Sequence, residues 1–114
     1  MDFLSYRDIQ YDRTVDISSY KRFLIQQDDG LFGILPDKPL SLKDMQGLVE
    51  GYVEQSPIPI YLQSQEWNMF WNEDAKQKNL PRNIPATDLW HISGGTLHTT
   101  IRGDVFMMRK GLFA

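Results

Sequence analysis

Residues 71–86 read WNEDAKQKNLPRNIPA, and the rest of the chain can be arranged around this polar stretch. An apolar, aromatic segment leads into it, and a short amphipathic helix is expected to follow it. Each of its two prolines fixes its own φ and disfavours the helical region for the residue before it. Asn72, Asn79 and Asn83 favour turns because their short amides hydrogen-bond to nearby backbone. We therefore expect residues 72–83 to form a connector with a defined shape.

The composition is that of an ordinary globular domain. The chain has 114 residues, of which 41% are hydrophobic and 24% are charged, and a chain of this length buries about two thirds of its unfolded surface. Its formal net charge of -3 creates no overall positive field that would attract nucleic acid or anionic lipid. Cysteine is absent, which excludes disulfides, zinc–thiolate sites and thiol nucleophiles.

No sequence signal points to secretion or to a membrane. The first eight residues, MDFLSYRD, lack the basic start and the apolar run of a signal peptide. No apolar segment approaches the length of a transmembrane helix. We expect a soluble, cytoplasmic protein without a membrane partner.

The first half of the chain predicts two helices and one strand. Residues 16–27 begin with two alternative capping residues, Asp16 and Ser18, and carry apolar side chains at helical spacing, which predicts a helix. Residues 31–35 are a short apolar run stopped by a proline, as in a strand. Ser41 is then expected to cap a helix that ends at Gly51. The residues expected on the buried face of this second helix are Leu42, Met45, Leu48 and Val49.

The second half predicts a hairpin, a helix and a last strand. Residues 52–54 resume extended structure, and the alternation in 58–62 and 67–72 indicates two antiparallel strands that reverse near Ser64 and Gln65. Residues 86–91 are expected to be helical, with a proline in the first turn. The segment 96–109 is expected to be a strand interrupted by a bulge at Gly103.

This order of elements predicts an α+β fold. We expect a mainly antiparallel sheet with two or three short helices on one face. A ferredoxin-like βαββαβ arrangement after an N-terminal helix is one topology that fits. The whole chain, residues 1–114, is expected to be a single domain, with an arm and helix in 1–29 and a core in 30–109.

Five short motifs occur in the order seen in one known family. They are LVEGYVE at 48–54, NEDAK at 72–76, LPRN at 80–83, AT at 86–87 and GDV at 103–105. In this order and spacing, the chain resembles the domain of unknown function 3846 family.

The resemblance covers residues from about 31 to 108. Members of that family are small proteins or domains frequent in bacteriophages, plasmids and their bacterial hosts, so the resemblance implies a small accessory protein. It carries no established activity or catalytic residue. The chain departs from the family pattern in residues 1–29 and in the inserted segment 90–95.

A catalytic or metal site has weak support. Glu73 and Asp74 could act as paired carboxylates, but a solvated turn is the favoured interpretation because perturbed carboxylates need burial. His91 and His98 match no strong zinc signature. We expect no catalytic residue, no metal site and no cofactor.

Aromatic and apolar residues leave two interpretations open. Trp67, Trp71 and Trp90 could form a platform for bases, although core positions are favoured for residues this large. The predicted last strand is apolar on both faces, and Phe106 and Met108 lie on one of them. Such a strand is either central in its sheet or exposes one face to a partner.

Three functions follow from these features. We favour a non-catalytic protein-interaction module of a mobile element or its bacterial host, with an apolar patch that involves Phe106, Met108, Tyr61 or the N-terminal arm. The alternative is a nucleic-acid or nucleotide-binding domain. Its binding residues would be cations beside an aromatic: Lys76, Lys78, Arg82, Arg102 and Arg109. A small hydrolase built on the carboxylates and histidines is the third.

If a ligand site exists, we expect it in the connector, because connectors held by a rigid scaffold often carry function. The candidate binding residues are Asn72, Glu73, Lys78, Arg82 and Asn83. Turn-making and helix capping is the competing interpretation for all five. A protein partner is expected, and a homodimer is an alternative because an unblocked edge strand can pair with a second copy.

Overall fold

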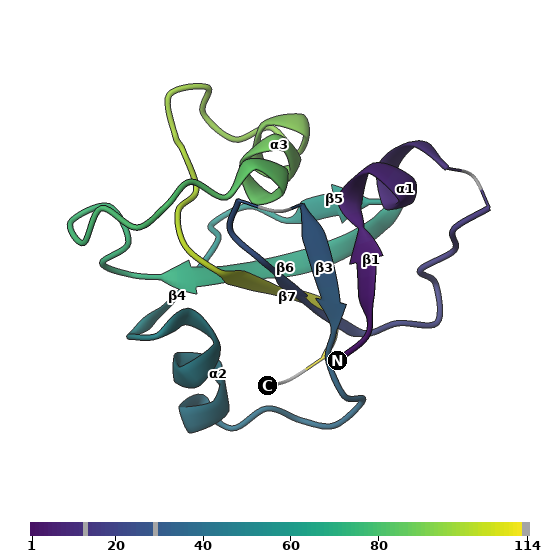
Figure 1. Cartoon of the computed structure of the whole chain (residues 1–114), viewed down its shortest axis with the longest axis horizontal. Helices are drawn as coiled ribbons and strands as arrows, with labels where there is room; N and C mark the ends of the chain where they lie inside the picture. Colours follow the sequence, from purple (N-terminus) through teal and green to yellow (C-terminus); the bar gives the residue numbers. More distant parts are fainter. Residues whose placement is uncertain (13, 29, 113–114) are drawn as a thin grey trace.

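The computed structural model describes residues 1–12, 14–28 and 30–112. These residues form a seven-stranded sheet and three helices (Figure 1). The strands are β1 (Phe3–Ser5), β2 (Arg22–Ile25), β3 (Leu31–Ile34), β4 (Val53–Gln55), β5 (Ile60–Leu62), β6 (Gln65–Asn72) and β7 (Val105–Arg109). The helices are α1 (Tyr6–Tyr11), α2 (Leu42–Val49) and α3 (Ile84–Ile92). The predicted α+β class is confirmed.

The strands lie in the order β1-β3-β2-β7-β6-β4, with β5 also paired to β6, and every pair is antiparallel. The ferredoxin-like arrangement is not the one observed. In that arrangement β3 would lie between β6 and β7, whereas these two strands pair directly. The strand that replaces β3 beside β7 is β2, from the N-terminal segment.

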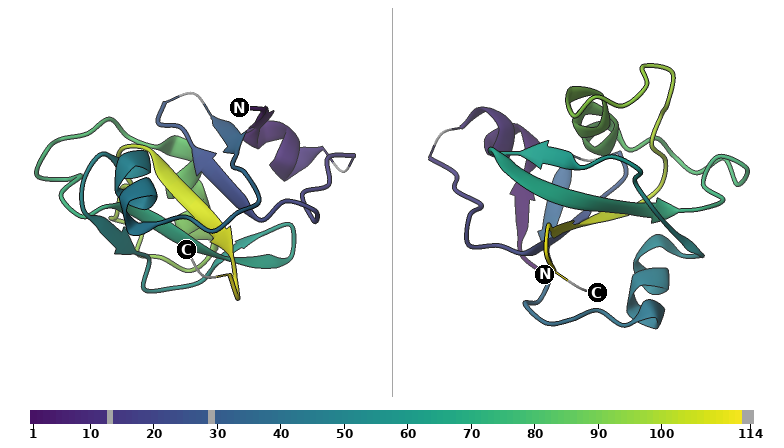
Figure 2. Two further views of the ribbon diagram at one scale, coloured as in Figure 1. Left: turned by 90° about the horizontal axis from the view of Figure 1, so that it is seen from below. Right: turned by 180° about the vertical axis from the view of Figure 1, so that it is seen from behind.

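Two helices lie on one face of the sheet, as expected, and a third covers the other face. Helices α1 and α3 lie on one face and α2 lies on the other (Figures 1 and 2). The face under α1 and α3 holds the larger core cluster, which includes Phe23, Phe32 and Trp67. The face under α2 holds a smaller one, which includes Phe106 and Met108. Two layers of helix therefore enclose the sheet.

The helix predicted for residues 16–27 is wrong. Residues 22–25 form β2, and all four of its residues are buried. A central strand buried on both faces shows no alternation, so a short apolar run of this kind cannot be told from a helical segment by its period. The residues expected to be an arm contribute β1 and α1 instead. The N-terminal segment is part of the sheet.

The strand at 31–35 and the helix after Ser41 are confirmed. The Ser41 side chain accepts a hydrogen bond from the Asp44 backbone N–H, and the Asp44 carboxylate accepts one from that of Ser41, which completes a capping box. The helix ends at Val49, two residues before the expected glycine, because its C-cap Glu50 adopts the left-handed conformation with φ 58°. Leu42 is 62% exposed rather than buried.

The predicted hairpin is confirmed. Strands β5 and β6 are joined by Gln63 and Ser64, whose φ values of 50° and 60° suit a tight two-residue turn. Along β6, Trp67 and Met69 point into the larger cluster, and Phe70 packs against the smaller one.

The last helix is confirmed, and the last strand is shorter than predicted. Asn83 caps α3, which ends at Ile92. Strand β7 begins only at Val105, because Gly103 has a φ of 78° and turns the chain. Residues 96–104 therefore form a loop that returns beside the connector, where Arg102 bridges to Arg82.

Candidate functional site

Asn72, the first candidate binding residue, has a structural role. It ends β6 and is 2% exposed. Its Nδ2 donates hydrogen bonds to the backbone oxygens of Val49, at 3.0 Å, and Glu50, at 3.3 Å. Its Oδ1 accepts one from the Asp74 backbone N–H at 2.7 Å. Asn72 thus fixes the start of the connector to the end of α2.

Asn83, at the other end of the connector, is fully buried. Its Nδ2 donates to the backbone oxygens of Ile25, at 3.0 Å, and Gly103, at 2.8 Å. Its Oδ1 accepts a hydrogen bond from the Ala86 N–H in the first turn of α3. Both amide hydrogens of Asn83 are used inside the protein, as the competing interpretation of helix capping predicted.

The other three candidate residues are exposed. Glu73 lines a pocket together with Trp71. Lys78 lies above Gly51, where its Nζ would be 3.3 Å from an added Cβ. Arg82 is held by its backbone bridge to Arg102. The structure therefore does not bring the five candidate residues into one site, and binding by the three exposed ones stays a prediction.

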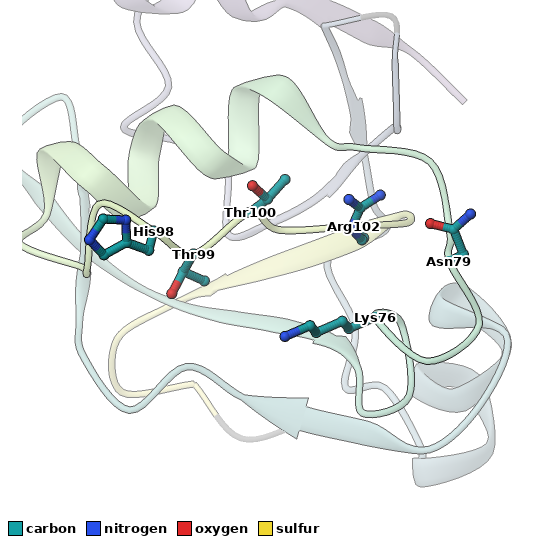
Figure 3. Close-up of a pocket in the computed structure, with 6 residues that line it drawn as sticks. All are labelled: Lys76, Asn79, His98, Thr99, Thr100 and Arg102. Atoms are coloured by element: carbon teal, nitrogen blue, oxygen red, sulfur yellow. The ribbon is translucent and has the colours of Figure 1, made fainter.

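A polar pocket of about 520 Å³ lies between the connector and the loop that precedes β7 (Figure 3). One wall is supplied by Lys76 and Asn79 of the connector. The opposite wall is supplied by one short stretch of the loop: His98, Thr99, Thr100 and Arg102. No carboxylate lines this pocket, so its charge is set by the lysine and the arginine.

A second pocket, of about 240 Å³, adjoins the first and shares four of its lining residues, Lys76, Thr99, Thr100 and Arg102. Its other side is formed by Trp71 with two glutamates, Glu54 and Glu73. We call the two pockets together the groove. We call the first pocket, which no carboxylate lines, the cationic end, and the part of the second pocket beside Trp71, where the glutamates lie, the acidic end. Lys76 and Arg102 line both pockets and so lie where the two meet.

Helix α3 holds the loop that forms one wall of the groove. The Trp90 indole N–H donates to the Thr96 backbone oxygen at 3.2 Å, and His91 Nε2 lies 3.1 Å from the backbone oxygen of Thr99. The Thr87 hydroxyl accepts a hydrogen bond from the Ile101 N–H at 2.9 Å. Gly95 fits against Trp90, where a Cβ would lie 2.1 Å from the ring. The wall is consequently tied to the core.

Arg102 joins the two walls. Its Nη1 donates a hydrogen bond of 3.0 Å to the backbone oxygen of Leu80 in the connector. Among the described residues, its other guanidinium N–H groups have no protein acceptor. A guanidinium has five N–H donors in a rigid fork, so Arg102 can hold the connector and still donate into the groove.

The aromatic residues divide between core and groove. Trp67 and Trp90 are buried, as the core interpretation predicts. Trp71 is half-buried, packs edge-on against Trp90 with ring centroids 5.8 Å apart, and lines the second pocket. Phe106 and Met108 are covered by the α2 face, so β7 is a central strand and these residues offer no surface to a partner.

The carboxylates and histidines considered for catalysis do not converge. His91 is held against Thr99, whereas His98 and Glu73 are exposed on different segments of the groove. Within the residues that the structure describes, no three histidine, cysteine or acidic side chains lie close enough to hold a metal ion. Arg109 is also used internally, since its guanidinium lies over the Trp67 ring and bonds the Ile17 backbone oxygen.

Sequence reasoning found part of the groove and missed part. Lys76 and Arg102 belong to the set of cations considered for nucleotide binding, but Thr99 and Thr100 were not singled out. These hydroxyl residues were expected in a strand, where alternate side chains would point to opposite faces. A turn signal was present at Gly103, the glycine after Arg102, and it could have placed residues 98–102 in a loop.

Comparison with protein-family models, with curated protein sequences and with solved structures finds no match to this chain. The resemblance of residues 31–108 to the domain of unknown function 3846 family therefore stays a prediction. None of the helices in the described part of the chain is long and apolar enough to cross a membrane.

Proposed function

We propose that this protein is a non-catalytic binding module for a nucleotide, which it holds in the groove between the connector and the loop at 98–102. One observation carries the proposal: Lys76 and Arg102, from opposite walls, line one polar pocket that contains no carboxylate. The two pockets have volumes of about 520 and 240 Å³, which lie in or near the range of about 300 to 1,000 Å³ typical of small-molecule sites.

The cationic end suits a phosphate. Arg102 offers a planar fork that matches phosphate oxygens, and Lys76 adds a mobile point charge. Thr99, Thr100 and His98 line the same pocket, and hydroxyl and ring N–H groups can donate hydrogen bonds to an anionic oxygen. The Thr99 hydroxyl also forms a hydrogen bond with that of Thr96.

The middle of the groove suits a base. Trp71 is half-buried and lines the pocket next to the cationic end. A base that stacks on an aromatic side chain gains about 1 to 3 kcal/mol. A phosphate and an attached base can therefore be held by adjoining parts of one groove.

A single nucleotide fits the charge of the chain better than a polymer. Its net charge of -3 disfavours a long anionic strand, whose binding depends on many lysine and arginine contacts along the backbone. The cations that line the groove are Lys76 and Arg102, which is enough for one phosphate group.

The proposal is tested by titrating the protein with the four common ribonucleoside monophosphates and following heat or tryptophan fluorescence. We expect saturable binding, which R102Q and K76Q each weaken by about tenfold, since a charge-assisted hydrogen bond contributes roughly 1.5 kcal/mol or more. The matched control is K43Q, which removes an exposed cation on α2, the opposite face of the sheet.

Unchanged affinity in both groove variants would place any binding elsewhere and contradict the proposal. Tight binding of a single-stranded oligonucleotide, with an affinity that falls steeply with salt, would replace the nucleotide with a polymer.

A protein partner is the second candidate, and the specific observation is the free edge of the sheet at β1. This strand pairs only with β3 in the described structure, and Phe3 on it is 42% exposed. Such an edge can accept an extended strand from another protein. Native mass spectrometry of protein recovered from cells tests it: F3K should abolish a stoichiometric complex, and a complex unaffected by F3K would contradict this second candidate.

A further inference from the structure

Two glutamates flank Trp71 at the acidic end of the groove. Glu54 lies directly opposite Trp71 in the ladder between β4 and β6, and directly opposed residues have their side chains on the same face, with Cβ atoms about 5 Å apart. Glu73 follows Trp71 by two positions, and its backbone N–H extends the ladder to the Tyr52 oxygen at 2.9 Å. Both carboxylates thus line the pocket from the side of the indole.

Both carboxylates are available to a ligand. In the part of the chain that the structure describes, neither Glu54 nor Glu73 forms an ion pair, and neither side chain takes part in a hydrogen bond found between described residues. Both residues are exposed. Since an ionised carboxylate accepts hydrogen bonds and donates none, this end of the groove selects a ligand edge that presents donors.

We propose that the nucleotide bound in the groove carries guanine, and that Glu54 and Glu73 select this base. This inference rests on the proposed function. With the phosphate at Lys76 and Arg102 and the base against Trp71, the edge of the base that faces away from the phosphate meets the glutamates.

Guanine alone among the common bases presents two adjacent donors on that edge, the ring N1–H and the exocyclic 2-amino group. A carboxylate can accept both at once in a bidentate pair. Adenine and cytosine each present one amino donor beside a ring-nitrogen acceptor, and uracil presents one N–H between two carbonyl acceptors. Against a carboxylate, those acceptors meet a negative oxygen without a hydrogen between them, which is unfavourable.

The chemistry at the two ends of the groove also orients the ligand. A phosphate is repelled by Glu54 and Glu73 and attracted by Lys76 and Arg102, so a nucleotide has one favourable direction along the groove. The proposed specificity determinants, Glu54 and Glu73, are therefore different side chains from the proposed phosphate ligands, Lys76 and Arg102.

The test compares the dissociation constants of guanosine, adenosine, cytidine and uridine monophosphates for the intact protein and for three variants. We expect guanosine monophosphate to bind about tenfold more tightly than the others, because a hydrogen bond to a charged group contributes roughly 1.5 kcal/mol. E54Q and E73Q should reduce this preference in two ways: they weaken binding of guanosine monophosphate, which loses the paired acceptor, and they strengthen binding of adenosine monophosphate, whose acceptors no longer face a negative oxygen. D88N is the matched control, since Asp88 is exposed on α3 and does not line the groove.

The outcomes separate the inference from the proposed function. Equal affinity for all four nucleotides, with loss of binding in R102Q, would overturn guanine selection and leave nucleotide binding in place. A guanine preference that survives both E54Q and E73Q would overturn the assigned role of the glutamates. Absence of binding for all four nucleotides would contradict both guanine selection and the proposed nucleotide binding.

Discussion

The two faces of the sheet are covered to different depths. Under α1 and α3, aromatic rings pack in a chain in which Tyr6 stacks on Phe32, Phe32 contacts Phe23, and Phe23 contacts Trp67, with centroids 5.4 to 5.9 Å apart. Under α2, one stacked pair, Phe70 and Phe106, is joined by aliphatic side chains.

The groove lies on the face of the sheet that α1 and α3 cover. Its loop wall is fastened to α3 through Thr87, Trp90 and His91. A ligand site needs walls that stay in place when the ligand leaves, and side chains fixed by a packed layer satisfy this need. We therefore expect substitutions on the α3 face to change both stability and binding, whereas substitutions on the α2 face should change stability alone.

The largest effect is expected from W67A. Trp67 is fully buried in the larger cluster and lies beneath the Arg109 guanidinium, 5.3 Å from its ring. Removing it leaves a cavity and should lower the free energy of unfolding by about 3 to 5 kcal/mol. Urea unfolding followed by circular dichroism measures this loss. F70A, on the face covered by α2, should lower the free energy of unfolding by less, because Phe70 is only half-buried. An equal or larger loss would contradict the comparison of the two faces.

N83A should have the next largest effect. Asn83 caps α3 and also satisfies the buried oxygens of Ile25 and Gly103. Loss of a cap and of buried hydrogen bonds together should reduce the free energy of unfolding by roughly 2 to 3 kcal/mol. Because the start of α3 would loosen, nucleotide affinity should fall as well. Full stability with lost binding would instead assign Asn83 to the ligand.

S41A, at the equivalent position of the helix on the other face, should cost about 1 kcal/mol, the usual contribution of an exposed N-cap. The Ser41 side chain accepts one hydrogen bond, from Asp44. Nucleotide affinity should not change, since α2 lies across the sheet from the groove. Chemical unfolding and a nucleotide titration on the same sample check both statements, and weakened binding would show that the two faces are coupled.

A dependence of stability on pH is expected in alkaline solution. Burial raises the pKa of Tyr6 to about 12, with a further contribution from the negative charge of Asp88. The unfolded chain loses this proton near pH 10 and the folded protein retains it, so the stabilisation is complete below pH 10 and is lost as the pH rises to about 12. Y6F should show a shallower decline of stability across this interval. Thermal unfolding at a series of pH values measures the difference, and identical slopes would refute it.

Local sequence signals predicted the elements whose two faces differ. The alternation of Trp67 to Asn72 gave β6, and the Ser41 cap gave the start of α2. These signals failed where a strand is buried on both faces, because polar and apolar residues then do not alternate along it. Residues 22–25 lie in the centre of the sheet and are buried on both faces, so Phe23 and Leu24 fit a helix as well as a strand.

The candidate site was predicted in part for the same reason. The connector was identified as the region of interest, but Asn72 and Asn83 turn inward to backbone oxygens that lie 20 or more residues away. The spacing of residues in the sequence does not predict hydrogen-bond partners this far apart along the chain. Lys76 and Arg102 lie on opposite walls of the groove. The two walls are held together by contacts between distant residues, such as the hydrogen bond from Arg102 to the Leu80 backbone oxygen.

Backbone preferences and the period of nearby side chains were enough to predict the class of fold, the hairpin, the Ser41 cap and the polar character of the connector. The order of the strands, the division of the helices between two faces and the placing of cationic and acidic residues in one groove became known only from the tertiary structure. Those features depend on which distant segments bury each other's surface, and a local pattern of polar and apolar residues is compatible with several such pairings.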